Sequence, residues 1–200
     1  MRNALYFLIA GLLLTACTAT APRRQDPTVG SPGHPVMIVA YTPNEQVRVG
    51  FEDRMEADLQ AAGISAVPSH NLVGNFSLVQ YDWVMRAAQQ RNAPMILMVR
   101  RLITDLPGDG TTAPDGISRH RSLRAYFLNA DRTRLADTPP PGRQVIEVMG
   151  YRRGGDTTEL VWSGYSWVDY DGDLADAIAR TSDIISKNLA PACKGMSCDF

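Results

Sequence analysis

The chain has 200 residues, with 20 lysine and arginine residues against 21 aspartate and glutamate residues. This balance argues against a nucleic-acid-binding function, because nucleic-acid-binding domains usually show a clear basic excess. After the N-terminal segments described next, about 165 residues are left, enough for one domain with a buried core.

The first 16 residues predict a secretory signal peptide. Arg2 and the free amino group give a positive start, and residues 4–16 are almost wholly apolar. This length suits the apolar core of a signal peptide. It is too short to span a bilayer, which needs roughly 20 apolar residues.

The signal ends in Leu14-Thr15-Ala16-Cys17, which resembles the lipobox of bacterial lipoproteins. The resemblance implies cleavage before Cys17, a diacylglycerol on its thiol, and an acyl chain such as palmitate on the new amino group. Two or more acyl chains anchor a protein stably. Thr18 follows where an aspartate would stand in inner-membrane lipoproteins, so the analogy implies the periplasmic face of the outer membrane. The alternative is an ordinary signal peptide that a cysteine happens to follow.

Residues 17–34 are expected to form a lipid-anchored tether, and residues 35–200 a single domain. The tether is rich in proline, threonine, glycine and serine, a composition that cannot bury a core. The domain opens with residues 36–41, a nearly continuous apolar run that is typical of a strand covered on both faces.

A helix is expected after this strand. Thr42 and Glu45 have the spacing of a capping box, with Pro43 at the first helical position. Gly63 ends the helix. One apolar row faces a core, formed by Val47, Phe51, Met55, Leu59 and Ala62.

The next segments repeat the alternation of strands and helices. Residues 64–68 predict a short strand, residues 78–92 a helix capped by Ser77, and residues 94–102 a third apolar strand. The order β-α-β-α-β indicates parallel strands joined by helical crossovers.

The second half predicts antiparallel structure. Residues 122–130 and 143–153 are expected to be strands, and Gly154-Gly155 a hairpin turn into a strand over residues 157–168. A final helix over residues 173–189 would be capped by Asp171 or Asp173. The expected fold class is therefore α/β with α+β character in its second half: a single sandwich domain with a mixed sheet and a C-terminal helix.

Cys193 and Cys198 flank a short loop at the end of the chain. An exported protein meets an oxidising compartment, so these cysteines are expected to form a disulfide. Their spacing does not fit a C-x₂-C metal site, and no second ligand pair is present.

An arginine-rich segment offers a candidate contact surface. Residues 104–121 are long for a loop inside a compact domain, and such loops are often functional. Arg119, Arg121 and Arg124 lie in or next to this loop and are the expected partner-binding residues. The alternative is that these arginines form an ordinary solvated face.

Catalytic and metal-binding motifs are largely missing from the sequence. Ser166 lies in G-Y-S-W-V, where Val168 replaces the last glycine of a nucleophile elbow. The acidic run at residues 169–173 has its glycine too early for a calcium loop, and Arg180 stands at position twelve. No pair of histidines has metal-ligand spacing among His34, His70 and His120. We therefore expect no catalytic residue, no metal and no cofactor.

The order of elements resembles small bacterial outer-membrane lipoproteins with a domain like the N-terminal domain of TolB and the core of CsgG-type lipoproteins. The resemblance covers residues 36–189 and includes a loose match to the hairpin arm of those proteins at Asp156, Thr158, Leu160, Val161, Trp162 and Gly164. It implies an α/β domain and carries over no catalytic residue. The transmembrane hairpins of CsgG-type pores are not evident in the sequence.

The sequence therefore predicts a lipid-anchored envelope protein that acts as a periplasmic binding or assembly module without catalysis. Its partners would be the membrane, through the lipid, and a periplasmic protein. One alternative is an envelope glycan hydrolase, which would need two carboxylates about 5 to 10 Å apart. The candidates for that pair are Asp105, Asp109 and Asp115. Another alternative is a structural subunit of an envelope complex, with self-association.

Overall fold

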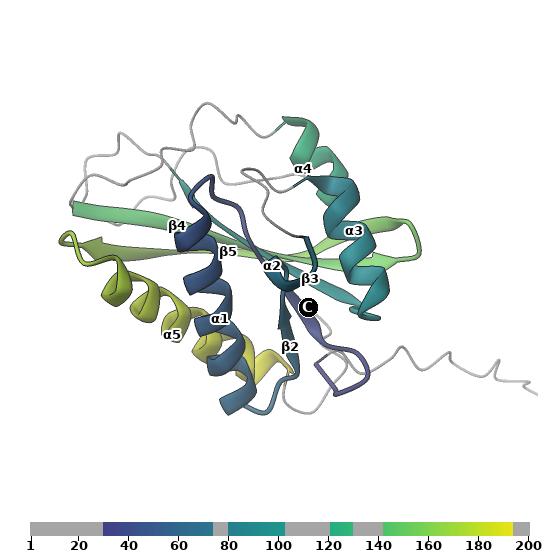
Figure 1. Ribbon diagram of the computed structural model, residues 1–200, viewed down its shortest axis with the longest axis horizontal. Helices are drawn as coiled ribbons and strands as arrows, with labels where there is room; N and C mark the ends of the chain where they lie inside the picture. The colour runs from purple at the N-terminus through teal and green to yellow at the C-terminus, as the bar shows by residue number, and fades with distance from the viewer. Residues whose placement is uncertain (1–29, 74–79, 103–120, 130–141, 194–200) are drawn as a thin grey trace, which may run out of the picture.

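The computed structural model describes residues 30–73, 80–102, 121–129 and 142–193 (Figure 1). Its elements are β1 (Val36–Ala40), α1 (Glu45–Ala61), β2 (Ala66–Pro68), α2 (His70–Val73), α3 (Tyr81–Gln90), β3 (Met95–Leu102), α4 (Leu123–Asn129), β4 (Gly142–Gly154), β5 (Thr157–Tyr170) and α5 (Leu174–Cys193). The strands form one mixed sheet in the order β2-β1-β3-β4-β5. This architecture confirms the predicted α/β class.

The sheet is covered on both faces. Side chains of β1 alternate between two buried clusters: Met37 and Val39 belong to one, and Val36, Ile38 and Ala40 to the other. The first cluster also contains residues of α3 and α4, and the second contains residues of α1 and α5. Helices α1 and α5 therefore lie side by side over one face, and α3 and α4 over the other (Figure 1).

The parallel half of the sheet is as predicted. β1 pairs in parallel with β2, from Val36 opposite Ala66, and with β3, from Val36 opposite Met95. All five residues of β1 are buried. Burial on both faces explains why these strands are continuous apolar runs rather than alternating ones.

The predicted hairpin is also present. Gly154 pairs with Thr157, and Gly155 between them has a φ of +64°, a backbone conformation that favours glycine. A β-bulge lies near Gly150 and Tyr151 of β4. Across from it, two consecutive β5 residues, Val161 and Trp162, both pack on the α1/α5 side.

The prediction of a strand over residues 122–130 is wrong, because this segment forms helix α4. Ser122 accepts a hydrogen bond from the Ala125 amide at 3.2 Å and caps the helix. Leu123, Tyr126 and Phe127 are all buried, and this i, i+3, i+4 spacing places them on one helical face. A strand would have sent the neighbours Tyr126 and Phe127 to opposite faces.

Two helix starts also differ from the expectation. Helix α1 begins at Glu45, and the side chain of Asn44, not that of Thr42, accepts a hydrogen bond from the Val47 amide at 3.1 Å. Helix α3 begins at Tyr81 after Gln80, which makes no side-chain cap. The predicted cap of α3, Ser77, lies outside the described residues.

The last helix begins as expected. The Asp173 carboxylate accepts hydrogen bonds from the amides of Ala175 and Asp176, so of the two predicted caps Asp173 is the one that caps α5. The helix continues to Cys193, four residues past its predicted end at 189. No helix in the described part of the chain is both long enough and apolar enough to cross a membrane.

Residues 30–34, which the sequence assigns to the tether, are packed against the domain. The Gly30 carbonyl accepts a hydrogen bond from the Ser65 amide at 2.6 Å, and the Gly30 amide donates to the His34 carbonyl at 2.8 Å. Gly30 has a φ of +77°, and a side chain there would collide with Ile64. Residues 30–34 therefore belong to the domain.

Replacement of Asn44 by alanine tests the observed cap of α1. We expect Asn44→Ala to lower the free energy of unfolding by about 1 kcal/mol, because the Val47 amide loses its acceptor. Chemical denaturation followed by circular dichroism measures this change. Gln46→Ala, an exposed change at the second residue of the same helix, should alter stability by less than about 0.5 kcal/mol. Equal effects of the two substitutions would contradict the cap.

Candidate functional site

The topology places a switch point at the carboxyl ends of β1 and β3. From β1 the chain crosses through α1, on one face of the sheet, to β2. It then crosses through α3, on the other face, to β3 on the opposite side of β1. In open α/β sheets, ligands bind in the crevice outside the carboxyl ends of the strands where the connections diverge in this way.

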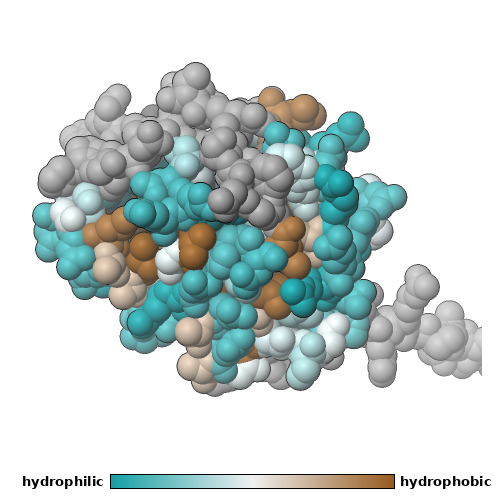
Figure 2. All heavy atoms as spheres, viewed as in Figure 1, coloured by the Kyte–Doolittle hydropathy of each residue, from teal (hydrophilic) through white to brown (hydrophobic). Residues whose placement is uncertain are grey.

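A pocket with a volume of about 120 Å³ lies at this place. Six elements (β1, α1, β3, β4, β5 and α5) and the residues that follow β1 form its wall, with α1 and α5 on one side and the ends of the strands behind them. The lining residues are Ala40, Tyr41, Thr42, Val47, Phe51, Val99, Arg100, Arg101, Gln144, Ile146, Val168, Tyr170, Leu174, Ala177, Ile178 and Thr181. Figure 2 shows hydrophobic side chains gathered on this side of the molecule.

Helix periodicity positions much of the wall. Val47 and Phe51 are one turn apart at the start of α1 and therefore share a face. Leu174, Ala177 and Ile178 have i, i+3, i+4 spacing at the start of α5. Both helices thus present apolar side chains from their first turns, where they flank the ends of the strands.

A charged pair is buried on the α3/α4 face of the sheet, behind the strand ends that line the pocket. The Arg100 Nε donates to the Glu147 Oε2 at 2.6 Å, and the Glu147 side chain is fully buried. The Arg100 guanidinium also lies 5.1 Å from the ring centre of Tyr126. Burial by itself would lower the pKa of Arg100, but Tyr126 and Glu147 outweigh burial and raise this pKa. Burial raises the pKa of Tyr126. Arg100 is therefore firmly cationic.

Arg101 lies in a different environment. Its guanidinium donates to the Gln144 side-chain oxygen at 3.3 Å, and burial lowers its pKa. Two hydroxyls of the wall are used internally: Tyr170 donates to the Gly172 carbonyl at 3.2 Å, and Thr181 to the Ala177 carbonyl at 2.7 Å. The described part of the lining contains no carboxylate, histidine or cysteine. It offers an apolar surface among guanidinium, amide and hydroxyl groups.

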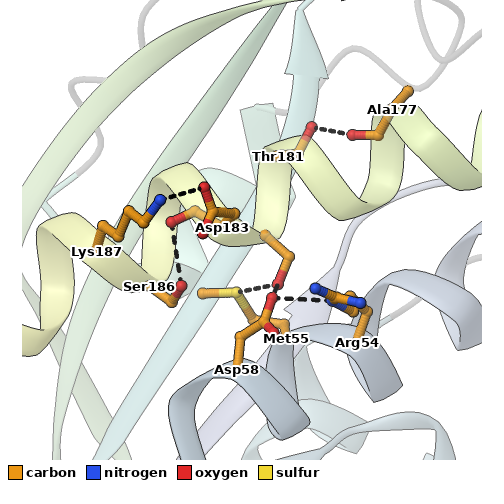
Figure 3. A network of polar contacts seen from close by, with 9 residues as sticks. Arg54, Met55, Asp58, Ala177, Thr181, Asp183, Ser186 and Lys187 are labelled. Atoms are coloured by element: carbon orange, nitrogen blue, oxygen red, sulfur yellow. Dashed lines mark hydrogen bonds and ion pairs between the residues drawn. The ribbon is translucent and has the colours of Figure 1, made fainter. Parts of the chain in front are cut away.

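Polar contacts hold α5 against α1 below the pocket (Figure 3). Ser182 of α5 donates to the Asp58 Oδ2 of α1 at 2.7 Å and lies 3.3 Å from the sulfur of Met55. Arg54 forms an ion pair with Asp58 at 3.0 Å. Ser182 is fully buried and small, which lets the two helices approach closely. These contacts fix the two helical walls of the pocket relative to each other.

Of the predicted binding and modification residues, the structure describes Arg121, Arg124 and Cys193, and none of these three lines the pocket. Cys17, Arg119 and Cys198 lie outside the described residues, as do Asp105, Asp109 and Asp115. Cys193 ends α5, and its proposed disulfide with Cys198 stays a prediction. Arg121 and Arg124 are exposed at the start of α4, on the face of the sheet opposite α1 and α5.

The histidines and Ser166, which were considered from the sequence as metal-ligating or catalytic candidates, lie in turns, helices and strands outside the pocket lining where the structure describes them. His34 lies in the turn before β1, near the Ser31 hydroxyl, and His70 begins α2; His120 is outside the described residues. Ser166 lies within β5, as expected. Within the described ranges, no group of three or more histidine, cysteine, aspartate and glutamate side chains could hold a metal ion.

The pair of Arg100 and Glu147 was not predicted from the sequence. A signal for it was present, because Glu147 interrupts an otherwise apolar strand segment from Val145 to Met149. Alternation places Glu147 on the same inward face as those two residues. A carboxylate buried in this way needs a cation, and Arg100 stands directly opposite on β3.

Comparisons with known proteins give few relatives. No known protein family matches the sequence, and no curated protein matches it. Among solved structures, the PelC dodecamer from Paraburkholderia phytofirmans is similar at 15% identity and a TM-score of 0.41, over 84% of this chain and 91% of that one. A point variant of that dodecamer gives 15% identity, a TM-score of 0.40, and 80% and 88% coverage. Similarity this distant carries no inference about function.

Removal of the Arg100 guanidinium should be costly, because Glu147 would stay buried without its counterion. We expect Arg100→Met to lower the free energy of unfolding by roughly 3–5 kcal/mol. Addition of Glu147→Leu should restore most of the loss, and urea denaturation of the full double-mutant cycle measures the coupling.

Arg143→Gln is the matched control, since Arg143 pairs with Asp169 at 3.3 Å across the same sheet but on the surface. It should cost less than about 1 kcal/mol. If Arg100→Met costs no more than Arg143→Gln, the buried pair does not contribute as described.

Proposed function

We propose that this protein is a lipoprotein of the bacterial cell envelope whose α/β domain binds a partner at the pocket between α1 and α5, without catalysis. The observation that carries the proposal is the position of this apolar pocket, at the carboxyl ends of β1 and β3 where the connections diverge. Binding sites concentrate at this position in α/β sheets.

The lipid attachment is supported by the sequence Leu14-Thr15-Ala16-Cys17 after an apolar run. Only residues 18–29 separate Cys17 from the packed turn at Gly30. A chain of this length spans at most about 40 Å when fully extended. A partner of the anchored domain would therefore be reached at or near the membrane, in our proposal at the periplasmic face of the outer membrane.

The size and character of the pocket favour an apolar anchor group. A protein cavity of about 150 Å³ lined by apolar side chains binds benzene. A volume of about 120 Å³ therefore suits one large apolar side chain of a protein partner. Such a side chain, buried at the centre of an interface, often dominates the binding energy. This fits a periplasmic protein as the partner.

A structural role in a larger assembly is the second candidate, and the sheet edge favours it. β5 is the last strand of the sheet and has 14 residues, and it contains no proline or lysine to protect the edge. Tyr165 on this strand is an exposed aromatic side chain. Pairing of β5 with a strand of a second copy or another subunit would cover this edge.

The glycan-hydrolase alternative, the family resemblance and the arginine surface stay predictions from the sequence. The carboxylates suggested for a glycan hydrolase lie outside the described residues, and the resemblance to TolB and CsgG-type lipoproteins stays a prediction. Arg121 and Arg124 would form a separate contact surface from the pocket, since α4 lies over the other face of the sheet. The partner experiment below separates these two surfaces.

The lipid anchor is tested by Cys17→Ser. We expect this variant to leave the membrane fraction and to be recovered in the soluble fraction, because the thiol that carries the diacylglycerol is gone. Cys198→Ser, which removes a different thiol, should stay with the membrane. Mass spectrometry of the wild-type protein should show a mature chain that starts at an acylated Cys17. A mature chain with an unmodified first residue, or one that still starts at Met1, would contradict the anchor.

The pocket is tested by filling it. Ala177→Phe places an aromatic ring in the wall at the start of α5, and we expect about a tenfold or greater loss of partner recovered by crosslinking in intact cells and mass spectrometry. Circular dichroism checks that the variant is folded.

Arg124→Ser tests the alternative surface on α4, and with the pocket as the binding surface it should leave recovery unchanged. If the partner is lost only in Arg124→Ser, the partner binds through the arginines near α4 and not through the pocket. Unchanged recovery of the partner in both variants would show that neither surface binds it.

A further inference from the structure

A fully buried carboxylate joins three elements at the end of β1. The Glu52 Oε1 of α1 accepts hydrogen bonds from the Ala40 amide at 2.9 Å and from the Ser69 hydroxyl at 2.8 Å. Its Oε2 accepts from the His70 amide at 2.8 Å and lies 3.0 Å from the His70 Nδ1. The Glu52 side chain thus connects α1 with β1 and with the start of α2.

The backbone explains why a carboxylate is needed there. β1 pairs with β2 only as far as Ile38 opposite Pro68, whereas its pairing with β3 continues to Ala40. The amide of Ala40 therefore lies beyond the end of β2 and is buried. A buried backbone amide requires an acceptor, and Glu52 supplies one.

The second nitrogen of His70 meets a second carboxylate. The His70 Nε2 lies 3.1 Å from the Oδ1 of Asp53, a neighbour of Glu52 on α1 that is half-exposed. A neutral imidazole can donate one hydrogen bond, whereas an imidazolium donates two. Because both ring nitrogens face carboxylate oxygens, only the protonated ring can donate to Glu52 and Asp53 together.

The charged groups around the ring favour protonation on balance. The hydrogen bond with Glu52 raises the pKa of His70 most, and the charges of Glu52 and Asp53 add to this, whereas burial and the nearby Arg48 oppose it. Glu56, one turn further along α1, adds a carboxyl group that interacts with His70. From β1 and residue 69, the Ala40 amide and the Ser69 hydroxyl donate to this cluster, whereas the Ser69 amide donates to the Ile38 carbonyl.

We propose that His70 is a proton-operated latch, which in its protonated form clamps α2 and the end of β1 onto α1 through Glu52 and Asp53. Loss of the proton removes one of the two donated hydrogen bonds and the positive charge that lies between the two carboxylates. The start of α2 then loosens from α1, and the Ala40 amide loses part of the structure that holds its acceptor in place.

The latch also reaches the candidate site, because Ala40 both donates to Glu52 and lines the pocket. The proposal does not depend on the lipid anchor or on the partner. It concerns the domain alone, so it can fail while the proposed function holds, and the reverse is equally true.

The direction of the pH dependence follows from the raised pKa of His70. A group with a higher pKa in the folded than in the unfolded state stabilises the fold fully below its unfolded value, which is about 6.5 for histidine. This stabilisation is lost as the pH rises through the folded value. The latch is therefore closed in mildly acidic solution and opens as the solution becomes alkaline.

Nuclear magnetic resonance and hydrogen exchange on the folded domain test the latch. The imidazole resonances of His70 should titrate above the ordinary histidine value. Protection factors of the Ala40 and His70 amides, which correct for the intrinsic effect of pH on exchange, should fall between pH 6 and pH 9. In His70→Gln the protection factors of the amides at positions 40 and 70 should be lower than in the wild type at pH 6 and should no longer change with pH.

Two further variants keep the test independent of folding defects. Asp53→Asn changes a half-exposed side chain and should lower the pKa of His70 and weaken the pH dependence. His34→Gln, which removes a histidine away from the cluster, should keep the full pH dependence of the wild type. Titration of His70 at or below its ordinary value, or constant protection of both amides, would overturn the latch.

Discussion

Burial of β1 and β3 on both faces is the constraint on which the rest of the structure depends. Every residue of β1 is buried, and its side chains divide between two clusters. Each cluster needs its own helical cover, which α1 with α5 and α3 with α4 provide. Because the crossover from β1 to β2 and the crossover from β2 to β3 run over opposite faces, the ends of β1 and β3 are left between diverging connections. The pocket lies there for that reason.

Two buried carboxylates complete this arrangement where the apolar pattern breaks. Glu147 faces inward from β4 and is matched by Arg100, directly opposite on β3. Glu52 supplies the acceptor that β2, which is too short, cannot give to Ala40. A buried charge without a partner is very costly, so each carboxylate selects the one arrangement that satisfies it. Neither carboxylate lines the pocket, but each is tied to a residue that does: Glu147 to Arg100 and Glu52 to Ala40.

The proposed anchoring and the proposed binding belong to separate parts of the chain. In the proposal, the N-terminal segment with Cys17 sets where the protein is held, and the pocket sets what the domain contacts. The exposed arginines of α4 lie over the other face of the sheet, so the domain offers two distinct surfaces. The long edge strand β5 is a third feature available to neighbours.

The sequence by itself determined the features that depend on local patterns. These include the apolar strands β1 and β3, the hairpin at Gly155, the core stripe of α5 and the lipobox-like segment. Each of these features depends only on residues that are contiguous or regularly spaced in the sequence. Only the tertiary structure decided that residues 123–129 are helical. Their aromatic residues suit a strand, but Leu123, Tyr126 and Phe127 are buried together only against α3 and the sheet. The pocket and the partners of Glu52 and Glu147 could not be predicted from the sequence either. They join residues far apart in the chain, and free energy from such contacts outweighs local propensity.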